Sequence, residues 1–98
     1  MPLDNLLLIR HRERLADVNY EIAKEQNKKI TQQEILKERL EGKAFNEQHN
    51  LRWDPYAQFT LEQIELEIAI SDAVIAKLVN EVKYLRVSLA ALYEKSHD

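Results

Sequence analysis

The C-terminal third of the chain carries the most regular pattern of apolar positions. Ten residues follow one another at alternating spacings of three and four, and nine of them are apolar. They are Leu61, Ile64, Ile68, Ser71, Ile75, Leu78, Val82, Leu85, Leu89 and Leu92. This heptad repeat predicts one long helix whose seam packs against another helix. Ser71 is the polar exception, and we expect its hydroxyl to bond back to the carbonyl of Glu67.

The start of this helix has its own signal. Thr60 and Gln63 form a capping box, in which the Thr60 hydroxyl can accept the amide of residue 63 and the Gln63 side chain can reach back to the amide of Thr60. Phe59 before the cap and Ile64 after it are placed as a hydrophobic staple. Because no glycine or proline follows, the helix is expected to run over about residues 60–95.

A second apolar stripe runs along the other side of the same helix. Its members are Leu66, Ile70, Ala73, Tyr84, Val87 and Ala91, interrupted by Lys77 and Asn80. Since a helix that is apolar on two sides is buried on two sides, we expect one stripe to meet the same chain and the other to meet a second chain. All apolar members of the heptad seam are therefore predicted to form an oligomer seam, most simply in a homodimer. The alternative is a monomeric antiparallel bundle, and flanking charges leave parallel and antiparallel pairing open.

The apolar spacing in the N-terminal half predicts two shorter amphipathic helices. In the first, over about residues 4–27, Leu8, Leu15 and Ile22 lie seven apart and share one face with Val18.

The second short helix is expected over about residues 31–48. Thr31 and Glu34 form another capping box, which favours a new start there over the alternative of one bent helix through both segments. Gly42 is expected to kink or end this second helix.

Residues 49–59 form the remaining loop, which is rich in turn formers and aromatic side chains. Trp, Tyr and Arg are the residue types that most often anchor protein interfaces. We therefore predict four partner-binding residues, Arg52, Trp53, Tyr56 and Phe59. In the alternative, Trp53 and Phe59 cap the end of the bundle. A mixture would place Trp53 inward, with Arg52 and Tyr56 outward.

Composition narrows the class of protein. The 98 residues predict one helical domain over residues 1–98, and a single glycine and two prolines argue against a sheet protein. The absence of cysteine excludes disulfides and thiolate metal sites. No apolar run approaches the roughly 20 residues of a membrane span, and the N-terminus does not resemble a signal peptide, so we expect a cytoplasmic protein.

Candidate chemistry is sparse. His11, His49 and His97 lie far apart at no metal-binding spacing, so no metal, cofactor or catalytic residue is predicted. Basic residues along the first predicted helix allow a weak nucleic-acid-binding helical dimer as an alternative. They are Arg10, Arg12, Arg14, Lys24, Lys28 and Lys29. Interleaved acids and a net charge of −3 favour a solvated face instead.

One stretch carries a family resemblance. Leu36–Lys37–Glu38–Arg39–Leu40, in the second of three predicted helices with an aromatic link to the third, resembles the small all-helical chorismate mutases. The resemblance implies a dicarboxylate site between helices, for which Arg10, Arg14 or Arg39 would supply cations. Gln32 and Gln33 depart from the family, since they stand where it offers a cation and an acid.

The pattern as a whole favours an all-α helical bundle or coiled-coil dimer without catalysis of its own. We expect it to bind another protein as an adaptor, inhibitor, chaperone or assembly factor. A small mutase-like enzyme is the alternative from a different class.

Overall fold

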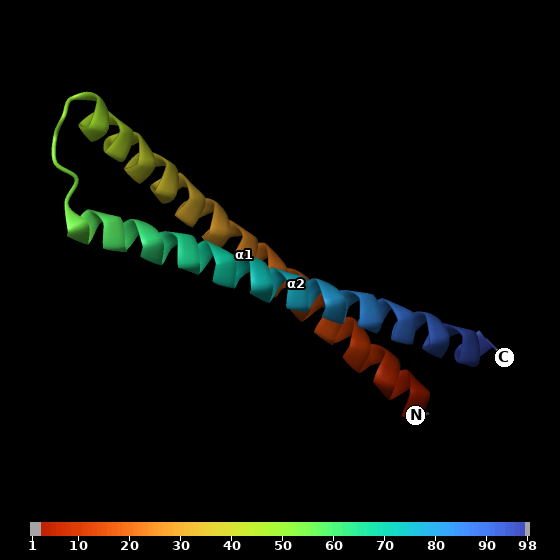
Figure 1. The fold of residues 1–98 in the computed structure, drawn as a ribbon. Coiled ribbons are helices and arrows are strands. Elements are labelled where there is room, and N and C mark those ends of the chain that lie inside the picture. Colours follow the sequence, from red (N-terminus) through yellow and green to blue (C-terminus); the bar gives the residue numbers. More distant parts are fainter. Residues whose placement is uncertain (1–2, 98) are drawn as a thin grey trace. The chain divides into compact units, whose positions relative to one another are not determined.

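The computed structural model describes residues 3–97, with the side chains of residues 5–95. Two helices make up nearly all of this part of the chain, α1 over Leu3–Gln48 and α2 over Pro55–His97 (Figure 1). Residues 49–54 join them, and no strand occurs among the described residues. The predicted all-α class is confirmed.

The predicted break before Thr31 is wrong, because α1 passes through it without interruption. The Thr31 hydroxyl donates to the carbonyl of Asn27 at 3.1 Å, the bond that a threonine makes inside a helix rather than at its cap. Lys28 and Lys29 continue the helix because lysine is a good helix former. The alternative of one helix through both segments therefore describes the connectivity correctly.

The turn is shorter than the predicted loop of residues 49–59, and α1 ends in a Schellman motif. The amide of Leu51 donates to the carbonyl of Asn46 at 2.7 Å, and that of Asn50 to Glu47 at 3.3 Å. Asn50 has a φ of 56°, in the left-handed region that asparagine tolerates better than most residues. Asn50 thus takes the position that glycine usually holds.

The predicted start of the long helix at Thr60 is also wrong, because α2 begins at Pro55. The Asp54 carboxylate accepts the amide of Tyr56 at 3.0 Å, which makes Asp54 the N-cap. Pro55 occupies the first helical position, where its fixed φ suits the helix and no amide is needed. Thr60 lies inside the helix, and its hydroxyl donates to the carbonyl of Ala57 at 2.8 Å.

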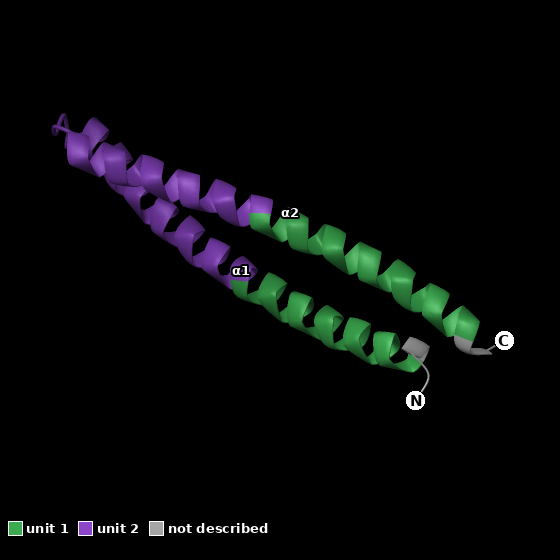
Figure 2. Ribbon diagram, turned by 90° about the horizontal axis from the view of Figure 1, so that it is seen from below, with its two compact units in different colours: residues 1–24, 74–98 green, residues 25–73 purple. Residues whose placement is uncertain are grey.

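The structure divides into two compact units (Figure 2). Unit 1 comprises Met1–Lys24 and Val74–Asp98, and unit 2 comprises Glu25–Ala73. In unit 1 the first part of α1 lies antiparallel beside the last part of α2 (Figure 2). In unit 2 the second part of α1, the turn and the first part of α2 form a helical hairpin.

Unit 1 has an apolar core. Its buried residues come from both helices, with Leu15 and Ile22 of α1 packed against them at its margin. They are Val18, Leu78, Val82 and Leu85. The predicted apolar face of the N-terminal segment therefore meets the heptad seam of α2.

The interface inside unit 2 is more polar on the α1 side. Ser71 is fully buried and donates to the Glu25 carboxylate at 2.8 Å, so the predicted bond to the Glu67 carbonyl is wrong. Lys29 forms an ion pair with Asp72. Polar α1 residues continue the heptad spacing of the apolar ones in sequence, so that α1 keeps facing α2 with polar side chains.

The apolar heptad seam of α2 is covered within one chain. Six of its members are buried: Leu61, Ile64, Leu78, Val82, Leu85 and Leu89. Ile68, Ile75 and Leu92 are partly buried. The side of α2 predicted as the oligomer seam therefore already has an intramolecular partner, and its contact with a second chain stays a prediction that this burial argues against.

Gly42 does not end the helix as expected, since α1 continues to Gln48. Its φ is not positive, and no atom lies within 4 Å of the place that a Cβ would occupy. Nothing in the fold therefore requires glycine at this position.

We expect Gly42→Ala to raise the free energy of unfolding by about 1 kcal/mol, because alanine loses less backbone entropy in a helix. Urea denaturation followed by circular dichroism measures this, with Glu41→Ala on the same exposed helix as the control. A loss of stability in Gly42→Ala would show that α1 bends or opens there.

Candidate interaction surface

Gln58 organises the turn end of unit 2. Its side-chain oxygen accepts hydrogen bonds from the Trp53 indole and the Lys43 ammonium group, each at 3.1 Å. Its amide nitrogen donates to the Glu62 carboxylate at 3.2 Å. Because Lys43 belongs to α1, Trp53 to the turn and Gln58 to α2, one amide connects all three segments.

The four predicted partner-binding residues lie in two different environments. Trp53 is partly buried and held by Gln58, whereas Arg52, Tyr56 and Phe59 are exposed. This is the mixture in which Trp53 lies inward, while the alternative in which Phe59 caps the end of the bundle is wrong. Whether these side chains bind a partner stays a prediction.

The outer face of α2 in unit 2 is apolar and exposed. Leu66 is 54% exposed and Ile70 is 52% exposed, and Ala73 continues the stripe. Residues 55–73 contain four carboxylates and no lysine or arginine. These are Glu62, Glu65, Glu67 and Asp72, of which Asp72 is paired with Lys29. We call Leu66, Ile70 and Ala73, with Glu62 and Glu67 beside them, the acidic patch.

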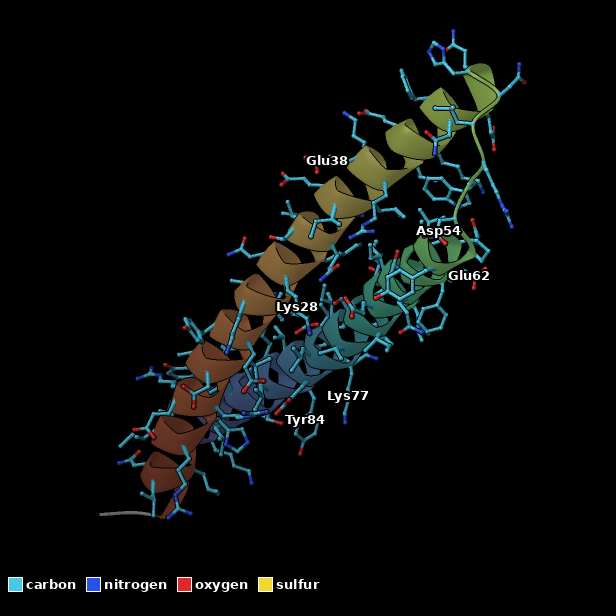
Figure 3. All side chains as sticks on the ribbon, turned by 90° about the vertical axis from the view of Figure 1, so that its left-hand side faces the viewer. Lys28, Glu38, Asp54, Glu62, Lys77 and Tyr84 are labelled. Atoms are coloured by element: carbon cyan, nitrogen blue, oxygen red, sulfur yellow. The ribbon has the colours of Figure 1, made fainter. Side chains whose placement is uncertain are left out.

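The outer face of α2 in unit 1 is also apolar but has the opposite charge. Tyr84 is 68% exposed and Val87 is 70% exposed, and Ala91 follows. Residues 74–97 contain four lysines and arginines against two glutamates. Lys77 and Tyr84 project from the side of α2 that is turned away from α1 (Figure 3). We call Tyr84, Val87 and Ala91, with Lys83 and Lys95 beside them, the basic patch.

A shallow groove lies along α1 in unit 2. Its volume is about 480 Å³. It is lined by Gln33, Leu36, Lys37, Leu40, Glu41 and Ala44. The sequence stretch that resembles a chorismate mutase therefore borders an open apolar groove rather than an enclosed polar site.

Two of the three arginines suggested by that resemblance have partners within the chain. Arg14 makes a two-pronged contact with Glu81, from Nε at 2.6 Å and from Nη2 at 3.0 Å. Arg39 donates to the Thr60 hydroxyl at 3.1 Å. The third arginine, Arg10, is exposed. The described residues form two helices rather than the three that the resemblance presumes.

The cations of the predicted nucleic-acid face are likewise engaged in part. The Arg12 guanidinium lies over the Tyr93 ring, 5.1 Å from its centroid, and Lys29 is paired with Asp72. Among the described residues, no three His, Asp or Glu side chains gather as a metal site requires.

Comparisons with protein-family models, curated proteins and solved structures found no match to this chain. Neither helix, over its described length, contains a stretch apolar enough to cross a membrane. Function must therefore be inferred from the side chains of the chain itself.

The contact between Arg14 and Glu81 changes the pKa of both groups. The hydrogen bond from Arg14 lowers the pKa of the Glu81 carboxyl, and the same bond raises the pKa of Arg14. Because the folded-state pKa of Glu81 is lowered, the pair stabilises the fold above the ordinary glutamate pKa. This stabilisation is lost as the pH falls through the lowered value.

We expect an NMR titration of the Glu81 side chain to give a pKa below that of an ordinary glutamate. Arg14→Gln should return it to the ordinary range, while Arg10→Gln, which removes an exposed cation from the same helix, should leave it lowered. An ordinary pKa for Glu81 in the unaltered protein would contradict the paired geometry.

Proposed function

We propose that this protein is a non-catalytic helical interaction protein that binds another protein through its exposed apolar side chains. The observation that carries the proposal is the exposure of two large aromatic side chains at the start of α2, Tyr56 at 70% and Phe59 at 55%, while the heptad seam is buried. Contiguous exposed apolar surface marks interaction sites more often than it serves stability. An adaptor, inhibitor, chaperone or assembly factor of the cytoplasm fits such a surface.

The turn end of unit 2 is proposed as the contact with the other protein. Tyr56 and Phe59 project near the first turn of a helix whose start is fixed by Asp54 and Pro55. Aromatic side chains on a rigid base lose little conformational entropy when they bind, which is why they dominate the energetics of many interfaces. Trp53 supports this base from within through Gln58.

The experiment is an affinity capture from cell extract with the immobilised protein, followed by mass spectrometry. We expect the combined Tyr56→Ala and Phe59→Ala variant to recover the captured protein at least about tenfold less well, since each anchor contributes more than 1–2 kcal/mol. Tyr20→Ala is the matched control, because Tyr20 is an equally exposed aromatic residue of unit 1.

Thermal unfolding checks that both variants fold as the unaltered protein does. Equal recovery by the Tyr56→Ala and Phe59→Ala variant and by the control would contradict a role for the turn end. If the same captured protein is lost with both variants, the contact is not specific to these aromatic residues.

A further inference from the structure

We propose that the acidic patch of one copy of this protein packs antiparallel on the basic patch of a second copy. The inference deepens the proposed function, on which it rests, because it assigns the outer face of α2 to self-association and leaves the turn end to the other protein. In this proposal a second copy of the chain covers the second apolar stripe of α2.

Charge is the first reason. The α2 segment of unit 2 carries four carboxylates without a cation, whereas that of unit 1 carries four lysines and arginines against two glutamates. Like charges facing each other oppose association, while complementary charges favour it and fix the register. A parallel pair in register would place acidic patch on acidic patch. An antiparallel pair places the acidic patch of each copy on the basic patch of the other.

Side-chain size is the second reason. Both patches repeat at spacings of four and three, so they can mesh in one antiparallel register. In that register Ile70 lies opposite Val87, and Tyr84 lies opposite Ala73. Leu66 then lies opposite Ala91, so that in two of the three pairs a large side chain meets an alanine. Alternation of large and small residues is what allows facing helices to fill the space between them.

Exposure is the third reason. The four large residues of these patches are each more than half exposed in the single chain, at 54% for Leu66, 52% for Ile70, 68% for Tyr84 and 70% for Val87. Covering them contributes free energy at roughly 25 cal/mol per Å² of apolar surface. Because each copy carries both patches, the second copy can make the same contact in return. The assembly is then closed at two chains.

Sedimentation equilibrium over a range of concentrations tests the proposal by comparing the mass with that of one chain, 11.6 kDa. We expect the unaltered protein to form a dimer. Ile70→Ser with Val87→Ser should weaken the dimer at least about tenfold, while the exposed control Tyr20→Ser should leave it unchanged.

A charge-swap experiment tests the antiparallel register. One variant combines Glu62→Lys and Glu67→Lys, which makes both patches basic, and the other combines Lys83→Glu and Lys95→Glu, which makes both acidic. Each alone should dimerise more weakly than the unaltered protein, and an equimolar mixture should recover a heterodimer.

A monomer at every concentration, or charge variants that dimerise as well as the unaltered protein, would overturn the inference. The inference would also be overturned if each charge variant dimerised alone but the equimolar mixture of the two did not. If the protein is a strict monomer whose captured protein is still lost in the Tyr56→Ala and Phe59→Ala variant, self-association alone is overturned and the proposed function stands. Should the Ile70→Ser and Val87→Ser variant lose an unlike partner while the mass stays that of one chain, the stripe belongs to that partner and the inference fails.

Discussion

The packing of one face of α2 on α1 is the constraint on which the rest of the structure depends. The heptad seam from Leu61 to Leu92 is buried or partly buried along its described length, including Ser71. Since a helix has one face opposite any seam, this packing leaves the second apolar stripe pointing outward. The exposed patches are thus a geometric consequence of the seam, and the functional proposals follow from what α1 leaves uncovered.

The two units use this seam with different chemistry. In unit 1 the α1 side contributes Val18, whose full burial contributes about 1.5–3 kcal/mol, and the partly buried Leu15 and Ile22, which contribute less. In unit 2 Glu25 and Lys29 make polar contacts instead, and a typical hydrogen bond contributes only about 0.5–1.5 kcal/mol net. At these positions unit 2 should therefore open more readily than unit 1.

The sequence patterns predicted the helical class correctly, because it depends only on periodicity, and the buried positions of α2 follow the heptad spacing. The contact of a second chain with either apolar stripe stays a prediction. The patterns misplaced the helix boundaries, since the capping-box pattern at Thr31 and Thr60 also occurs inside helices, where the hydroxyls bond to preceding carbonyls. The Asp54–Pro55 pair was the stronger start signal. Of the candidate site, the outward positions of Arg52 and Tyr56 could be foreseen. The role of Gln58 could not, because it depends on where α2 begins and on Lys43 of the other helix.

The most direct test of the central claim compares the two faces of α2 in a dilute, monomeric sample. The chain has no cysteine, so a single thiol can be placed by Leu85→Cys on the seam or by Val87→Cys on the outer face of the same unit. We expect the thiol at position 85 to react with a thiol reagent at least about tenfold more slowly, because it reacts only when the helices separate. Equal rates at the two positions, or a shielded thiol at position 87, would contradict the division of α2 into a covered face and a free one.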